Sequence, residues 1–225
     1  MQYAVDSIVR QLQKKYNLSY FPFVKNTLQA YKTNIIKEIM FQVESSKLNH
    51  KPFSCRLVKG AFLNAEKAKS NQKQKISPVC GTFRYTQQNM TESISYILKN
   101  MTPNSHLNIA TSNKDCVSLC IQLSKQLNLN KNSISFCQFR GMGDNITELT
   151  LNQGYISYKQ IPYGPLHQML PYIIKRSEET HDSIKASTVD QIKIIKKELF
   201  NERKLHIKVG IGCGLLVAIM IGLIA

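Results

Sequence analysis

Acidic residues are scarce in this sequence. The 225-residue chain carries 14 Asp and Glu against 30 Lys and Arg, which gives a formal net charge of +16. Such an excess favours a polyanionic partner: nucleic acid, an anionic membrane surface or a phosphate-bearing cofactor. The competing interpretation is a compositional bias, because much of the excess is lysine in a chain rich in Asn and Lys. Basic and aromatic residues do not alternate in a recognised pattern, so we expect no nucleic-acid partner.

Several motifs are also missing. The six cysteines form no CxxC pair and no Cys/His cluster, which argues against a structural metal and favours reduced, buried thiols. No G-x-G-x-x-G follows a strand-like run, so the dinucleotide-binding fingerprint is absent. The first residues carry no signal or transit pattern and are typical of a helix inside a domain. With 43 % hydrophobic residues, a packed core is expected.

One long apolar run lies at the C-terminal end. Residues 209–225 (VGIGCGLLVAIMIGLIA) contain no charge and follow a basic stretch from Arg203 to Lys208. A helix of this length spans about 25 Å, close to the hydrocarbon core of about 30 Å, and Ile207 can lengthen it. A buried core helix is disfavoured because every face is apolar. We expect a transmembrane anchor over 207–225 after a helical basic linker over 186–206, with the basic flank on the cytosolic or matrix side.

Strand-like and helix-like runs alternate before this tail. Strands are predicted at 21–27, 53–61, 106–111, 134–139 and 155–161. Helices are predicted at 4–15, 32–46, 90–101, 113–127, 144–152, 164–178 and 187–204, with Thr91 and Asn113 as candidate caps and 66–74 as a polar segment. This alternation predicts parallel βα units in a barrel or a doubly wound sheet.

Polar residues stand near the carboxyl ends of the predicted strands. In barrels such positions are usually functional. The residues concerned are Gln29, Arg56, Lys59, Ser112, Asn113, Gln138 and Gln160. Each residue taken singly has a structural explanation, a strand-end salt bridge for Arg56 and a satisfied core amide for Gln29. Together they favour a functional site at this end of the sheet.

Six short segments, taken in their order along the chain, form a recognisable set of motifs. They are NTLQAY (26–31), RLVKGAF (56–62), ATSN (110–113), FCQFRGM (136–142), YKQIPYG (158–164) and YIIKRSEE (172–179). From about residue 1 to 183 the chain resembles the proline dehydrogenase family, most specifically in RLVKGAF and in the paired YKxxPYG and Yxx[KR]RxxE motifs. The resemblance implies a distorted (β/α)₈ barrel with FAD at the carboxyl ends of its strands. It also implies oxidation of L-proline to Δ1-pyrroline-5-carboxylate by hydride transfer to the flavin, with electrons passed to membrane quinone.

The predicted strands correspond to strands four to eight of that barrel. We therefore expect residues 1–185 to be the C-terminal part of the barrel in an incomplete form, since the family's earlier strands carry a Lys and an Asp of the active site. A longer protein that contains those strands is one explanation, and a degenerate relative is the other. Quinone reduction would make the anchor intelligible, so a mitochondrial inner-membrane location is expected.

The resemblance assigns cofactor contacts residue by residue. Gln29 and Arg56 would lie against the isoalloxazine ring, where Arg56 could stabilise negative charge on the reduced flavin. Lys59, with the backbone of Gly60 and Ala61, would face the flavin and its phosphates, and a glycine there permits close backbone approach. The remaining cofactor contacts would come from Thr111, Ser112, Asn113, Gln138 and Glu179.

The substrate contacts would come from the last motif. Tyr172, Lys175, Arg176 and Glu179 match the family's Tyr-x-x-Arg-Arg-x-x-Glu pattern. Neighbouring helix residues point about 100° apart, so an adjacent pair of cations can grip a carboxylate beside the helix. Arg176 keeps the bidentate fork, whereas Lys175 keeps only the charge. The alternative for this pair is a solvated helix face.

The chain departs from the family pattern at four positions. Lys175 replaces an Arg, Ser112 a His and Thr180 an Asn. Gln160, a catalytic-site candidate together with Arg56, stands where proline-specific members carry a Tyr and hydroxyproline-specific members a smaller polar residue. A proline dehydrogenase is therefore the first hypothesis. The alternatives are a hydroxyproline dehydrogenase or a non-catalytic, tail-anchored remnant of the barrel.

Overall fold

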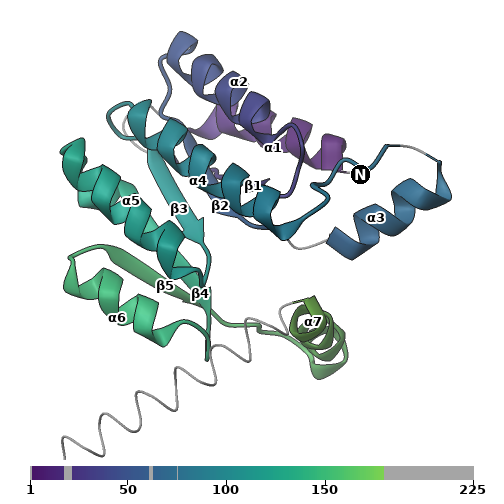
Figure 1. Ribbon diagram of the computed structural model, residues 1–225. Coiled ribbons are helices and arrows are strands. Elements are labelled where there is room, and N and C mark those ends of the chain that lie inside the picture. The colour runs from purple at the N-terminus through teal and green to yellow at the C-terminus, as the bar shows by residue number, and fades with distance from the viewer. Residues whose placement is uncertain (1, 18–21, 61–62, 75, 180–225) are drawn as a thin grey trace, which may run out of the picture.

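A computed structural model describes residues 2–17, 22–60, 63–74 and 76–179 of the chain, in which strands and helices alternate (Figure 1). The strands are β1 Asn26–Gln29, β2 Ser54–Val58, β3 His106–Ala110, β4 Ile134–Phe139 and β5 Ile156–Gln160. The helices are α1 Gln2–Tyr16, α2 Ile35–Leu48, α3 Leu63–Gln72, α4 Phe83–Lys99, α5 Lys114–Gln126, α6 Asp144–Asn152 and α7 Leu166–Glu179, with a 3₁₀ turn at Lys131–Ser133.

The strands form one parallel sheet in the order β1-β2-β3-β4-β5. Because each strand lies beside its predecessor, every connection is a crossover of the same kind. Figure 1 shows α2, α4, α5 and α6 together on one side of the sheet, while α7 lies apart from this layer beyond the end of β5. The prediction of five parallel βα units is confirmed, and the described strands form an open sheet.

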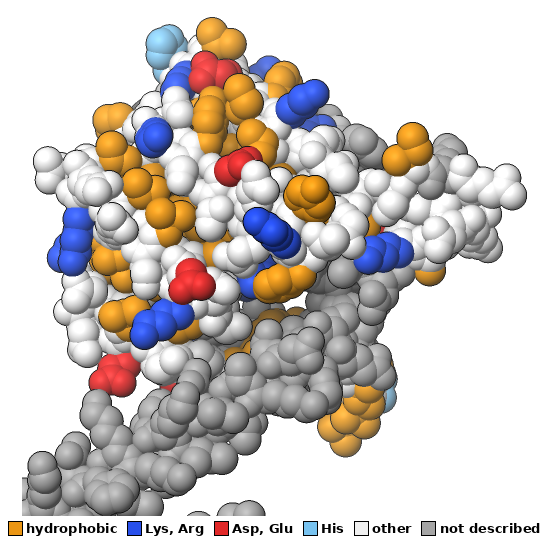
Figure 2. Space-filling model, viewed as in Figure 1, with side chains coloured by type: hydrophobic (Ala, Val, Ile, Leu, Met, Phe, Trp, Pro, Cys, Tyr) orange, Lys and Arg blue, Asp and Glu red, His pale blue; other side chains and the backbone are white. Residues whose placement is uncertain are grey.

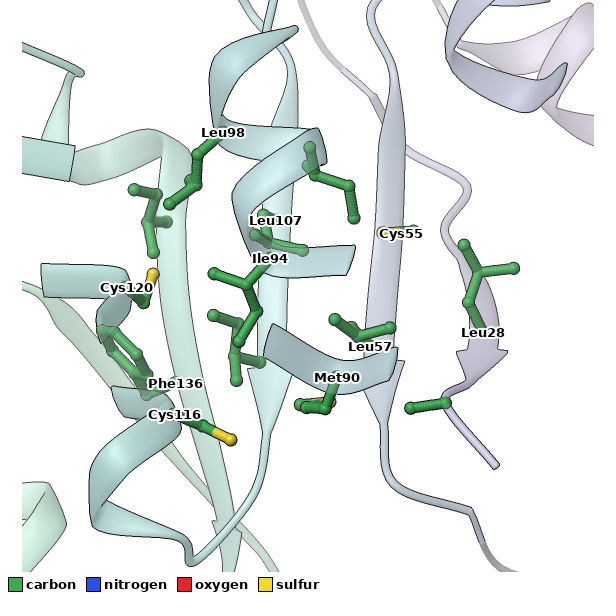
Figure 3. Close-up of a cluster of buried hydrophobic side chains, with 14 of the residues drawn as sticks. Leu28, Cys55, Leu57, Met90, Ile94, Leu98, Leu107, Cys116, Cys120 and Phe136 are labelled. Carbon is green, nitrogen blue, oxygen red and sulfur yellow. The ribbon is translucent and has the colours of Figure 1, made fainter. Parts of the chain in front are cut away.

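The core lies between the sheet and this helical layer. Leu57, Ile109 and Phe136 on neighbouring strands are fully buried and face the helices. In α4, residues one helical turn apart, among them Met90 and Ile94, pack over the strands (Figure 3). Side chains alternate between the two faces of a strand, so these positions fix the orientation of every other residue in the sheet.

The opposite side, which we call the polar face, carries different side chains. Thr27, Arg56, Asn108 and Ser135 are in register across β1 to β4. The Asn108 Nδ2 donates to Ser135 Oγ at 2.7 Å, and both side chains are buried. The sheet is therefore amphipathic, with an apolar side under the helices and a hydrogen-bonded side opposite.

Three local predictions need correction. The N-cap of α4 is Thr82, which accepts from Tyr85 N, and not Thr91, whose hydroxyl donates to the Gln87 and Gln88 carbonyls inside the helix. The first turns of α4 expose aromatic side chains, so they lack the apolar period that would have marked the start of the helix. The polar segment 66–74 belongs largely to α3, and the strand expected at 21–27 is β1, which begins later. The Asn113 cap of α5 is confirmed, with Oδ1 accepting from Cys116 N.

The described cysteines match the expectation of buried thiols. Cys55, Cys80, Cys116, Cys120 and Cys137 are buried and free. On the face drawn in Figure 2, basic side chains are scattered over the surface and form no continuous patch. Among the helices in the described ranges, none has the length and hydropathy to cross a bilayer. The linker expected at 186–206, the anchor expected at 207–225 and Cys213 lie outside those ranges.

A pH dependence follows from the amino end of the sheet. The His106 Nδ1 lies 3.0 Å from Lys25 Nζ, and burial, reinforced by this charge, lowers the pKa of His106 to about 4. The unfolded chain takes up a proton near pH 6.5, so protons favour unfolding between these values. The free energy of unfolding should therefore fall as the pH drops from about 6.5 to 4. A His106→Gln variant should lose this part of the slope in urea titrations at several pH values.

The control is His167→Gln, since the His167 side chain is exposed. This variant should keep the pH slope of the parent chain. An unchanged slope in His106→Gln would contradict the assignment to His106.

Candidate active site

Arg56 lies inside β2, two residues before the strand ends, and its side chain is on the polar face. Its Nη2 donates to Gln160 Oε1 at 2.7 Å and contacts Cys137 Sγ at 3.6 Å. Both partners are neutral, so these contacts differ from the strand-end salt bridge considered as the structural alternative. The guanidinium lies across the sheet from β2 to β5.

The Nε of Arg56 differs from Nη2 in having no acceptor in the described ranges. Within the described part of the chain, the buried Nε has no hydrogen-bond partner. Leaving a buried donor unsatisfied costs about 1–3 kcal/mol, and the cost is higher for a charged group. A ligand with an acceptor atom at this position would remove that cost.

Gln160 extends the contact to α7. Its Nε2 donates to the Tyr172 hydroxyl at 3.2 Å. Residues from β2, β5 and α7 therefore meet at the carboxyl end of the sheet. Lys175, Arg176 and Glu179 belong to the same helix, although their side chains lie outside the described part of the structure.

Lys59 occupies a second part of this end of the sheet. Its Nζ lies 4.4 Å from the centre of the Phe83 ring at the start of α4. Burial lowers the pKa of Lys59, and the nearby Cys116 and Asp115 at the start of α5 partly oppose this shift. An ammonium beside two helix N-termini is an arrangement that suits a phosphate.

Most of the predicted site residues after β3 and in β4 form hydrogen bonds with other parts of the chain. The Thr111 hydroxyl accepts from Asn113 N at 3.1 Å, and Asn113 caps α5. Gln138 lies on the helical side, where its Nε2 donates to the Thr111 carbonyl and its Oε1 accepts from Thr147. Ser112 is exposed. These residues shape the loop beside Lys59 and do not contact Arg56 or Gln160 through these bonds.

The remaining predicted residues lie near the end of β1. Gln29 is buried and lines a cavity of about 960 Å³ together with Tyr31 and Lys32. Gly60 has φ +144°, and a Cβ built on it would lie 1.5 Å from Cδ1 of the Tyr31 ring. Ala61 lies outside the described residues. Sequence reasoning missed Tyr31, although it closes the NTLQAY motif, and Phe83, for which the sequence offers no signal.

The geometry defines a parallel α/β sheet whose polar side chains gather at the carboxyl end. A family model described as proline dehydrogenase matches residues 2–188. The chain therefore belongs to the proline dehydrogenase family, whose members are flavin-dependent enzymes.

Curated relatives agree with this membership. The chain is 29 % identical to "Proline dehydrogenase 1, mitochondrial" of Drosophila melanogaster over 89 % of its own length and 30 % of the relative's. It is 28 % identical to "Hydroxyproline dehydrogenase" of Xenopus laevis over 81 % of its own length and 41 % of the relative's. The chain thus spans less than half of either relative.

Solved structures show the same fold. The crystal structure of proline utilization A from Bdellovibrio bacteriovorus superposes with a TM-score of 0.71 at 22 % identity, over 79 % of this chain and 18 % of that one. The five-stranded sheet therefore matches part of the proline dehydrogenase barrel, as expected from the motifs.

Gly60 provides a test of this geometry. A Gly60→Ala variant should lose about 1–3 kcal/mol of unfolding free energy, because the methyl group meets Tyr31 and the backbone has positive φ. The matched control is Gly81→Ala, where a Cβ meets nothing within 4 Å. It should stay within about 0.5 kcal/mol of the parent chain. Equal losses in urea titrations of the two variants would contradict the close approach of Tyr31.

Proposed function

We propose that this chain supplies the cofactor-contacting and substrate-contacting part of an FAD-dependent dehydrogenase that acts on proline or hydroxyproline. The observation that carries the proposal is the half-buried side chain of Arg56, which has a buried Nε on the polar face, unpaired among the described residues, and is linked through Gln160 to Tyr172. These are the residues to which the family motifs assign the cofactor and the substrate. Membership of the family supports the assignment.

The residues present fit a flavin dinucleotide. Bound FAD would supply the acceptor for a hydride from the substrate ring. Arg56 would donate from Nε to an acceptor atom of the flavin and favour negative charge on its reduced form. Lys59, beside the start of α5, would neutralise phosphate. Thr111, Ser112, Asn113 and Glu179 are proposed to complete the cofactor site, together with Gln29 and the backbone at Gly60 and Ala61. Gln138 would support this site from the helical side, where it holds the Thr111 carbonyl.

The substrate would be bound by α7. A carboxylate lying beside this helix would be held by Lys175 and Arg176, and Tyr172 would border the ring. A mitochondrial location is proposed because relatives carry "mitochondrial" in their names. Electron transfer to quinone at the inner membrane is proposed from the family resemblance alone. The chain covers less than half of the relatives' length. We therefore propose that the complete reaction also needs the active-site Lys and Asp that the family carries on its earlier strands.

A flavin titration of the full chain tests the role of Arg56. Titration with FAD should give saturable binding by quenching of flavin fluorescence. An Arg56→Met variant should weaken binding about ten- to a hundredfold, as expected from the loss of hydrogen bonds by a charged group. Arg140→Met is the matched control, because Arg140 is exposed at the end of β4 and should leave the affinity unchanged. Absence of FAD binding by the parent chain, or equal affinities of parent chain and Arg56→Met, would refute the proposal.

A second candidate, a non-catalytic remnant of the barrel, is favoured by the residues at Gln160 and Lys175. In the family these positions choose and grip the substrate, and here both differ from the proline-specific pattern. A Lys175→Arg variant of the flavin-loaded protein separates the two candidates. If the site binds substrate, restoring the bidentate fork should lower the dissociation constant for L-proline about tenfold in equilibrium titrations. Binding of neither L-proline nor hydroxyproline, in parent chain and variant alike, would support the remnant.

A further inference from the structure

Gln160 uses both ends of its amide. Its Oε1 accepts from Arg56 Nη2 at 2.7 Å, and its Nε2 donates to the Tyr172 hydroxyl at 3.2 Å. The three residues come from β2, β5 and α7, and 104 positions separate Arg56 from Gln160. One side chain thus joins the centre of the sheet to the helix that carries the substrate motif.

The orientation of this amide is determined by its partners. A guanidinium has only donors, so the amide oxygen of Gln160 must face Arg56. The amide nitrogen then faces Tyr172, whose hydroxyl can accept. A flipped amide would set donor against donor at Arg56. The contact with a permanently charged donor is also the shorter and stronger of the two.

The two bonded groups serve different sides of the proposed site. Arg56 holds its Nη2 on Gln160 while the buried Nε stays unpaired within the described residues. Tyr172 lies one turn before Lys175 and Arg176 on α7. A movement of α7 would therefore displace the Gln160 amide, and this amide also determines how the Arg56 guanidinium is rotated.

We propose that Gln160 is a positioning residue that fixes α7 relative to Arg56 and so sets the spacing between the substrate helix and the cofactor-facing guanidinium. This inference rests on the proposed function for the meaning of the two sides, but the coupling itself is a property of the folded chain. A Leu at position 160 satisfies neither partner. A Glu satisfies both, since a carboxylate accepts from Arg56 and from the Tyr172 hydroxyl.

Hydrogen–deuterium exchange of the full chain without flavin tests the coupling. In peptides covering 166–174, Gln160→Leu and Tyr172→Phe should each raise the exchange rate roughly two- to tenfold, as expected when one hydrogen bond holding the helix is lost. The double variant should exchange no faster than the faster single variant, because both remove the same link. Gln160→Glu should keep the exchange of the parent chain.

The matched control is Gln153→Leu. Gln153 also uses its amide oxygen, accepting from Lys125 Nζ at 2.6 Å, but this contact joins α5 to the end of α6. Exchange in 166–174 should not change in this variant. Additive effects of the two single substitutions, or exchange in Gln160→Leu equal to that of the parent chain, would overturn the proposal.

A second readout uses the flavin-loaded protein. Gln160→Leu should weaken the binding of L-proline about tenfold in equilibrium titrations, because a loosened helix presents its substrate-binding residues in the right place less often. Gln160→Glu should restore the dissociation constant to within about threefold of the parent value. A failure of Gln160→Glu to restore this affinity would exclude positioning through these two bonds. If the chain binds no FAD while the exchange results hold, the proposed function fails and the link between Arg56 and α7 stands.

Discussion

The burial of one side of the parallel sheet is the constraint on which the rest of the structure depends. Leu57, Ile109 and Phe136 can leave water only by facing the helices, and burial of such side chains contributes about 1.5–3 kcal/mol each. A strand that directs these residues to the helices must direct their neighbours to the other side. The position of Arg56 on the polar face follows from the position of Leu57 in the core.

This constraint gives the polar face its chemical character. Arg56 on that face needs hydrogen-bond acceptors. It bonds to Gln160 in β5 and contacts Cys137 in β4. The helical side uses its polar residues differently, since Gln138 in β4 donates to the Thr111 carbonyl and accepts from Thr147. Two sets of polar residues therefore lie at one end of the sheet. The set around Arg56 has a donor that is unpaired within the described part of the chain, the Arg56 Nε. The other set lies beside Lys59, which is near two helix N-termini.

Much of the fold could be predicted from local sequence. Runs such as 134–139 and 144–152 match β4 and α6 residue for residue, because turn residues mark their ends. The start of α4 could not be predicted in this way, since its first turns expose Phe83 and Tyr85 and carry no apolar period. The helix at 63–72 could not be predicted, because its sequence has no apolar stripe with a helical period.

The candidate site was predicted in its membership but not in its connections. The motifs named Arg56, Gln160 and Tyr172 from their resemblance to a family, and that resemblance is a property of the sequence alone. Which of them touch depends on strand order and on the side of the sheet that each residue faces, and these depend on contacts between distant segments. The sequence by itself determined the alternation of strands and helices, and it determined the family. Both follow from short segments of the chain that can be interpreted without knowing how distant residues meet. Only the tertiary structure decided that Arg56 meets Gln160 across 104 positions and that Gln138 turns to the helical side, because packing of the core selects the face of every strand.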